Sequence, residues 1–374
     1  MRYRAALRPL VLLFATALQF SGTAFAQICN QQSYQTRAIP LGVSGSNINS
    51  IKIPYCCTGT LGSLVQDTSG KQYVLSNNHV LARTSSTSGQ ASLGEGTMQP
   101  GLADNSCIKN SGDNVANLSA WVPLSFTRGT TNTVDAATAA VISGDVNTSG
   151  SILNVGLIGG AYTGSPLGLA VQKMGRTTCL TSGTVGAVNV TVSVRYPNQC
   201  NAASSGTATF VNQIAINSST FSAGGDSGSL IVTTGSCPLA VGLLFAGSST
   251  MTIANPIGPV LSGLGASMSN TVSMVTACTP LTASSTSASS GSTPARGASS
   301  RALKLASAVK ERHEGELMKL SEVVGVGVGL GAHPGEAAIV VFLNHFTAEA
   351  LAAVPAALEG VPVHAEETGE FVAY

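Results

Sequence analysis

The stretch Gly224-Gly225-Asp226-Ser227-Gly228-Ser229, followed by the apolar run Leu230-Ile231-Val232, predicts the fold more strongly than any other part of this chain. A serine nucleophile needs a tight loop, and glycines on both sides permit backbone conformations that a side chain would forbid. Such a loop lets the N–H groups of Gly225 and Ser227 point at one spot, where they would stabilise an oxyanion. A Gly/Ser-rich turn before a strand is also typical of an ordinary β-hairpin. The stretch therefore predicts a nucleophile loop only if other segments agree with it.

A histidine stands in a suitable context earlier in the chain. A serine hydroxyl needs a base in contact with it, and imidazole titrates near neutrality. His79 follows Tyr73-Val74-Leu75-Ser76-Asn77-Asn78, an apolar run that enters a short polar turn. The other histidines all lie beyond residue 300: His313, His333, His345 and His364. If Ser227 has an imidazole partner within its own domain, that partner is His79.

The third group must be an acid that holds the imidazole in one tautomer. The acids between His79 and Ser227 are Glu95, Asp104, Asp113, Asp135, Asp145 and Asp226. Asp135 begins the apolar run Ala136 to Val141, whereas Glu95, Asp104 and Asp113 lie in Gly/Asn-rich loops. We assign Asp135, with Asp104 and Asp113 as fallbacks, and we expect Asp226 to support the nucleophile loop.

Together these segments resemble the trypsin-like (chymotrypsin-fold) serine peptidases of bacterial type. Ser76-Asn77-Asn78-His79-Val80, the Asp135 segment and Gly225-Asp226-Ser227-Gly228 occur in the family's order, and the Lys173 to Val185 stretch is also similar. The resemblance covers residues 59–265. It implies an all-β double barrel, an endopeptidase with an acyl-enzyme intermediate, and no cofactor. Cys179 replaces a common glycine, and Ser229-Leu230 replaces a common Gly-Pro.

The resemblance also indicates where a substrate would lie. Residues 241–248 are similar to the strand that pairs with peptide substrates in β fashion. The cleft residues expected on this basis are Phe221, Ser222, Ala223, Ala246, Gly247 and Ser248. None of them is charged, so we predict an uncharged S1 pocket for a protein or peptide substrate.

The pattern along the rest of the chain is of short apolar-alternating runs between turn signals. Between Gln27 and Cys278 this pattern predicts only strands, in two halves divided near residues 143–151. No long helical periodicity is visible there. Residues 279–300 are nearly all Ser, Thr, Ala, Gly and Pro, which predicts a linker. Residues 301–374 predict a small α+β accessory domain.

The N-terminus and the cysteines indicate export. Residues 1–26 read as a secretory signal peptide, which leaves a peptidase domain over residues 27–278. All eight cysteines follow it, so disulfides are expected, with Cys179 and Cys200 predicted to clip one segment and Cys56 and Cys57 to pair elsewhere. Their spacing does not suggest a metal site. A net charge of +1 gives no case for nucleic acid, and we expect no stable membrane insertion of the secreted or periplasmic protein.

The C-terminal region has a glycine-rich run, residues 325–331, which we interpret as a strand with glycines packed against a helix. A small domain on a tether suggests the hypothesis of an intramolecular inhibitor or folding aid that contacts the peptidase domain. Two other functions stay open for the whole chain. One is a catalytically silent peptidase-like scaffold for surface binding, and the other is an esterase that uses the same three residues.

Overall fold

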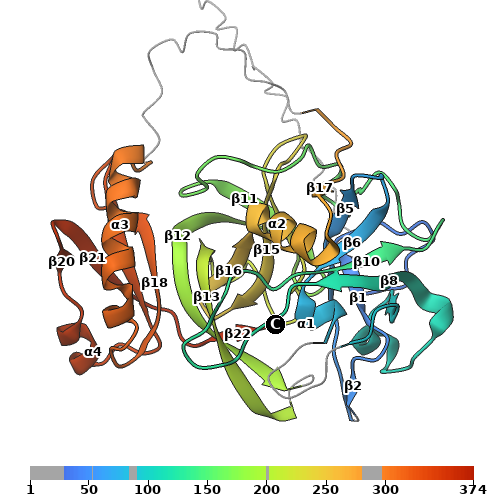
Figure 1. Cartoon of the computed structure of the whole chain (residues 1–374), viewed down its shortest axis with the longest axis horizontal. Helices are drawn as coiled ribbons and strands as arrows, with labels where there is room; N and C mark the ends of the chain where they lie inside the picture. The colour runs from blue at the N-terminus through green and yellow to red at the C-terminus, as the bar shows by residue number, and fades with distance from the viewer. Residues whose placement is uncertain (1–28, 53, 84–90, 199–201, 280–296) are drawn as a thin grey trace, which may run out of the picture.

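The computed structural model describes residues 29–374 except residues 53, 84–90, 199–201 and 280–296 (Figure 1). The predicted signal peptide and most of the predicted linker lie outside the described residues. Two large β-sheets dominate the fold, and the C-terminal region adds strands and helices beside them (Figure 1). The expected fold class, an all-β double barrel with a small C-terminal α+β region, is confirmed.

The first sheet has eight strands in the order β17-β5-β6-β10-β8-β7-β1-β4. Their bounds are β1 Val43–Asn47, β4 Gly59–Leu61, β5 Ser63–Asp67, β6 Gln72–Ser76, β7 Gly96–Met98, β8 Asn114–Trp121, β10 Ala137–Val141 and β17 Val272–Met274. The short segments near them are β2 Ile51–Lys52, β3 Tyr55–Cys56, α1 Asn78–Leu81, η1 Leu102–Asn105 and η2 Ser111–Asp113. Neighbouring strands of this sheet pair antiparallel, which suits a sheet built from hairpins.

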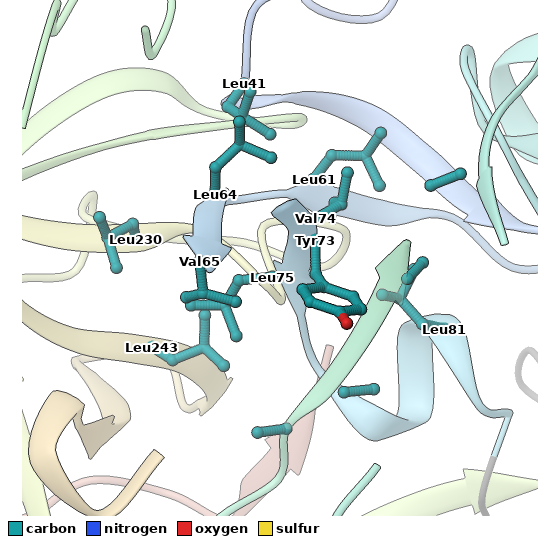
Figure 2. Close-up of a cluster of buried hydrophobic side chains, with 14 of the residues drawn as sticks. Leu41, Leu61, Leu64, Val65, Tyr73, Val74, Leu75, Leu81, Leu230 and Leu243 are labelled. Carbon is teal, nitrogen blue, oxygen red and sulfur yellow. The ribbon is translucent and has the colours of Figure 1, made fainter. Parts of the chain in front are cut away.

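One hydrophobic core joins the two sheets. Leu61, Leu64 and Leu75 from the first sheet pack in the same buried cluster as Leu230 and Leu243 from the second (Figure 2). These leucines are almost fully shielded from solvent. Because the core is shared, the loops between the sheets are held at a fixed junction.

The second sheet runs without interruption from the middle of the chain into its C-terminal region. Its order is β20-β21-β19-β18-β12-β11-β14-β15-β16-β13-β9, and β22 pairs with both β12 and β15. The strands before residue 257 are β9 Thr131–Asn132, β11 Ala170–Gly175, β12 Cys179–Asn198, β13 Ala202–Asn217, β14 Leu230–Thr233, β15 Ala240–Gly247 and β16 Met251–Pro256. The later elements are α2 Ile257–Met268, α3 Ser300–Leu317, β18 Val323–Leu330, β19 Ala337–Leu343, α4 Ala348–Ala353, β20 Ala357–Leu358, β21 Val361–Glu367 and β22 Phe371–Ala373.

The glycine-rich run is a strand, β18, but its glycines do not face the helix. A Cβ added at Gly327 would come within 2.8 Å of Val190 on β12. Val326 and Val328 instead share a buried cluster with Ala306 and Val309 of α3. The predicted packing of glycines against a helix is therefore wrong, because the small residues let β18 approach the β12 hairpin and the valines cover α3.

Two other expectations need correction. Residues 257–268 form the helix α2, although the sequence suggested only strands before Cys278. Its three glycines lower helix propensity and hid the signal, but Ile257, Val260 and Leu264 are buried on one face, so tertiary packing stabilises it. Cys179 forms a disulfide with Cys29, so the predicted clip from Cys179 to Cys200 is wrong.

The remaining described cysteines are also oxidised. Cys56 pairs with Cys107, and Cys237 pairs with Cys278. Cys57 is disulfide-bonded as well, which agrees with the expectation that the two neighbours pair separately. Three cross-links between distant segments are the chemistry of an oxidising compartment. Within the described ranges, the helices are all too short or too polar to cross a membrane.

Candidate active site

The residue 224–229 loop connects β13 to β14 and is organised around a buried acid. Gly225 has a φ of +97° and Gly228 one of +92°, so the turn uses the left-handed region that favours glycine. The Asp226 carboxylate accepts hydrogen bonds from the N–H groups of Thr177 at 2.7 Å and Thr178 at 3.1 Å. It also lies 3.5 Å from the ammonium of Lys173, and both side chains are fully buried. Asp226 therefore braces the loop from inside.

The same loop is tied to the first sheet through Thr60 of β4. The N–H of Thr60 donates to the carbonyl of Ser227 at 2.8 Å, and its hydroxyl donates to the carbonyl of Gly225 at 3.0 Å. Ser76, at the end of β6, donates to the carbonyl of Thr60 at 2.7 Å. Because β6 leads directly into α1, which carries His79, these bonds fix the position of the Ser227 loop relative to His79.

His79 and Asp135 are in direct contact. The Nδ1 atom of His79 lies 2.6 Å from Oδ2 of Asp135, and the His79 N–H donates to Oδ1 at 3.2 Å. Asp135 is fully buried just ahead of β10, and its own N–H donates to the side chain of Asn255 at 3.0 Å. A carboxylate on Nδ1 fixes the tautomer that leaves Nε2 able to accept a proton.

A tyrosine that the sequence did not single out completes this contact. The hydroxyl of Tyr196, on β12, donates to Oδ2 of Asp135 at 2.7 Å. The Tyr196 ring meets the His79 imidazole edge to face, with 5.8 Å between ring centres. Burial, then the charge of Asp135, raise the pKa of Tyr196 well above its usual value, so the hydroxyl stays a donor.

The pKa of His79 reflects two opposing effects. Burial lowers it, but the charge of Asp135 and their hydrogen bond raise it, and the carbonyl of Tyr374 adds to the rise. The pKa of His79 therefore lies above its ordinary value of 6.5. The protonated imidazole is stabilised here, which is what a group that receives a proton during a reaction requires.

Ser227 faces this pair across the junction, with a backbone segment between them. Its hydroxyl donates to the carbonyl of Phe245 at 3.1 Å, and the N–H of Tyr374 donates to that same carbonyl at 3.3 Å. The carbonyl oxygen of Tyr374 lies 2.9 Å from Nε2 of His79. Among the described residues, the partner of Nε2 is this backbone oxygen of Tyr374 and not the Ser227 hydroxyl.

The two N–H groups expected to stabilise an oxyanion are available. Among the described residues, neither Gly225 nor Ser227 donates its backbone N–H to a protein acceptor, although the neighbouring N–H groups of Asp226 and Gly228 do. A Cβ added at Gly225 would come within 2.6 Å of the Thr177 hydroxyl. Glycine is thus needed at this position for space as well as for φ.

The expected cleft residues lie on or just after β15 and before the serine loop, and none of the six lines the cavity beside His79. Ala246 pairs with Ala373 and Gly247 with Val372 in an antiparallel ladder between β15 and β22. The carbonyl of Ser248 accepts a hydrogen bond from the Tyr374 hydroxyl at 3.4 Å. The other three line the loop below: Phe221 is fully buried, Ser222 contacts Thr252, and Ala223 donates to Asp226.

The fallback acids lie elsewhere. Asp104 forms an ion pair with Arg176 and accepts from the Ser44 hydroxyl, and Asp113 belongs to the short helix η2. Of the weighed acids, Asp135 is the one that contacts His79. In the described part of the chain, His, Cys, Asp and Glu side chains nowhere gather in a group of three or more that could hold a metal ion.

Comparison with known proteins gives a limited likeness. No family model and no curated protein matches the chain. Among solved structures, Thermobifida fusca protease A has a TM-score of 0.40 and 19% identity, covering 64% of this chain and 98% of that one. A glutamic-acid-specific serine protease has a TM-score of 0.41 and 20% identity, covering 63% of this chain and 100% of that one. Nocardiopsis protease has a TM-score of 0.40 and 19% identity, covering 64% of this chain and 99% of that one.

Proposed function

We propose that this chain is an exported serine endopeptidase that cleaves peptide bonds with His79, Asp135 and Ser227. One observation carries the proposal. An extended backbone segment lies against β15 with the carbonyl of Tyr374 at Nε2 of His79, and its N–H shares the Phe245 carbonyl with the Ser227 hydroxyl. The backbone oxygen of an extended segment is therefore accommodated between the imidazole and the serine loop, which is where a peptidase must hold the carbonyl of its substrate.

The first half of the reaction follows from this arrangement. The Ser227 hydroxyl turns from the Phe245 carbonyl toward His79, and Nε2 accepts its proton as Oγ bonds to the substrate carbonyl carbon. The carbonyl electrons move to the oxygen, where the N–H groups of Gly225 and Ser227 stabilise the negative charge. Asp135 remains ionised and stabilises the imidazolium.

The second half returns the proton. Nε2 of His79 donates it to the leaving nitrogen, the carbon–nitrogen bond breaks, and an acyl-enzyme on Ser227 remains. Water then gives a proton to Nε2 of His79 as its oxygen bonds to the acyl carbon. The bond between that carbon and Oγ breaks, His79 returns the proton to Oγ, and the carboxylic acid product leaves. A cleft of about 510 Å³ continues from His79 and Tyr374 along Thr58, Gly59 and Arg176, where the leaving part of a substrate would fit.

Export is supported by the disulfides. Cross-links such as Cys29–Cys179, which joins residues 150 apart in sequence, persist in oxidising compartments and are rare in the cytosol. The proposed secretory signal, residues 1–26, agrees with this compartment. Comparing the mature N-terminus by mass spectrometry with Gln27 tests it, and a mature chain that retains Met1 would contradict export by this route.

Labelling with a fluorophosphonate probe tests the enzymatic proposal. We expect the probe to add to Ser227 in the folded chain, located by peptide mass mapping, and not to a Ser227→Ala variant. Turnover of casein should fall by about five orders of magnitude or more in that variant, because the nucleophile and base act as a unit. Absence of labelling both in correctly folded wild-type protein and in a folded Tyr374→Gly variant, in which the segment at Ser227 is weakened, would indicate a binding scaffold. Labelling with hydrolysis of simple esters but not of casein would indicate an esterase.

A further inference from the structure

The segment Phe371–Tyr374 occupies the cleft in the manner of a substrate. We propose that it is a built-in pseudosubstrate that restrains the enzyme and that the S1 pocket it fills selects tyrosine-like aromatic residues. This inference rests on the proposed function and goes beyond it by naming the class of residue cleaved after and the segment that competes with the substrate. Figure 1 shows the last residue of the sequence beside α1 and β22, at the junction of the two barrels.

The backbone of this segment is held on both sides. The strand β22 pairs antiparallel with β15, through Ala246↔Ala373 and Gly247↔Val372. It pairs parallel with β12, through Val194↔Phe371 and Arg195↔Val372. A strand inserted between two others satisfies its N–H and C=O groups without reading its side chains, so the backbone contacts supply affinity for any extended peptide.

The side chain of Tyr374 supplies the specificity. It packs at the edge of a buried apolar cluster that contains Phe221, and its hydroxyl contacts the Ser248 carbonyl at 3.4 Å and the Ser222 side chain. A Cβ at Gly247 would come within 2.1 Å of the Tyr374 hydroxyl, so the pocket has this depth only because residue 247 is glycine. Ser222 and the Ser248 carbonyl are neutral partners, which suit a phenol. The charge that acts on the hydroxyl is that of Asp226, which is already paired with Lys173.

The two buried residues of this segment, Ala373 and Phe371, do not define a preference for a substrate side chain. Ala373, one residue before Tyr374, is buried and lines the same cleft as His79. Phe371 is fully buried and its ring meets that of Phe342 on β19, with 6.1 Å between centres. Phe342 belongs to the C-terminal region. While Phe371 of β22 packs against Phe342, a free peptide substrate cannot make the same contact.

A covalently attached occupant competes strongly with free substrate. Tethered ligands act at effective concentrations of about a millimolar when the linkage allows binding. A peptide substrate must therefore displace Phe371–Tyr374 before its carbonyl can reach Ser227. Weakening the hold on Tyr374 should raise the apparent affinity for substrates without changing the groups that carry the chemistry.

Two full-length variants and three short substrates test the inference. Tyr374→Gly empties the S1 pocket but keeps the β22 backbone, whereas Tyr374→Phe retains the ring as the matched control. The substrates are acetyl-Val-Ala-X p-nitroanilides with X as Tyr, Glu or Lys. We expect Tyr374→Gly to raise kcat/KM for the Tyr substrate about tenfold or more, mainly through KM, while Tyr374→Phe stays near wild type. In every protein the Tyr substrate should be preferred by about a hundredfold.

A second measurement does not depend on how the variants fold. The free peptide acetyl-Phe-Val-Ala-Tyr should inhibit competitively, and acetyl-Phe-Val-Ala-Glu should not. Equal kcat/KM for wild type and Tyr374→Gly with both folded, or a preference for the Glu or Lys substrate, overturns the inference while fluorophosphonate labelling of Ser227 leaves the proposed function intact. Absence of labelling in both wild type and Tyr374→Gly removes the proposed function itself.

Discussion

At the scale of single residues, Oδ2 of Asp135 is the atom on which the site converges. It accepts from His79 Nδ1 at 2.6 Å and from the Tyr196 hydroxyl at 2.7 Å. Two donors on one buried carboxylate oxygen share its charge, and hydrogen bonds to charged groups are worth about 1.5–3 kcal/mol. Tyr196 is therefore a positioning residue, because it acts on His79 through Asp135 and does not itself meet the substrate carbonyl.

Replacing Tyr196 by phenylalanine should move the pH dependence of the reaction. The wild-type pKa of His79 lies above 6.5, so kcat/KM should rise with pH as the imidazole loses its proton in that range. Without the Tyr196 hydroxyl, more of the Asp135 charge acts on His79, which raises the imidazole pKa further. We expect the acid limb of the kcat/KM profile to shift to higher pH and kcat to fall about tenfold.

Tyr73→Phe is the matched control for that prediction. Tyr73 also donates to a carboxylate, Asp67, at 3.0 Å, but it lies in the first barrel at the β5–β6 hairpin. Its loss should leave the acid limb in place. A Tyr196→Phe variant whose profile and kcat match those of wild type would show that the Tyr196 hydroxyl is only a packing feature.

At the scale of elements, the β18 glycines permit the close contact between the C-terminal strands and the β12 hairpin. A Cβ at Gly327 would lie 2.8 Å from the Val190 side chain, a stiff β-branched group, and 3.4 Å from Ala187. Overpacking a closed interface typically costs about 1–3 kcal/mol. Gly327→Val should lower the free energy of unfolding by that amount in urea titrations.

Gly315 on α3 offers the control for this element. A Cβ there meets no atom within 4 Å, so Gly315→Ala should hold or raise stability, by up to about 1 kcal/mol from helix propensity. If Gly327→Val unfolds at the same urea concentration as wild type, β18 is free to move away from β12. The contact would then be too weak to align β22 with the cleft.

Much of the element pattern could be predicted from the sequence, since apolar alternation locates β6, β10, β14 and β18 within a residue or two. The sequence also singles out His79, Asp135 and Ser227 as candidates, because their local segments carry recognisable turns and strand starts. Tyr196 and Tyr374 carry no such signal. Each lies in or after an ordinary strand, and its role depends on pairing with residues far away in sequence, which no local pattern encodes. The Cys29–Cys179 bond escaped for the same reason.

At the scale of the whole molecule, one sheet extends from β20 to β9, so the C-terminal region continues the second barrel (Figure 1). Helix α3 crosses this seam with polar as well as apolar contacts. The Lys310 ammonium donates to the Thr191 hydroxyl on β12 at 2.8 Å, and Thr191 donates to Glu314 at 2.7 Å. Lys310 forms an ion pair with Glu314, and its side chain is only 2% exposed. A buried ammonium at this seam makes the contact depend on pH.

The direction of that dependence follows from the pKa of Lys310. Burial lowers this pKa below 10.5, although the hydrogen bond and charge of Glu314 partly oppose the shift. At a pH between the lowered pKa and 10.5, the unfolded chain therefore binds more protons at this position than the folded chain does. Stability contributed at this position must therefore rise with pH through that window.

In a Lys310→Met variant the titrating group is gone. The free energy of unfolding of wild type relative to Lys310→Met should increase as the pH rises toward 10.5, the ordinary pKa of lysine. Lys304→Met, on the exposed side of α3, is the control for loss of one positive charge. We expect the increase in the free energy of unfolding with pH to be larger relative to Lys310→Met than relative to Lys304→Met. Equal increases would mean that Lys310 is hydrated and that the polar contact between α3 and β12 does not form in solution.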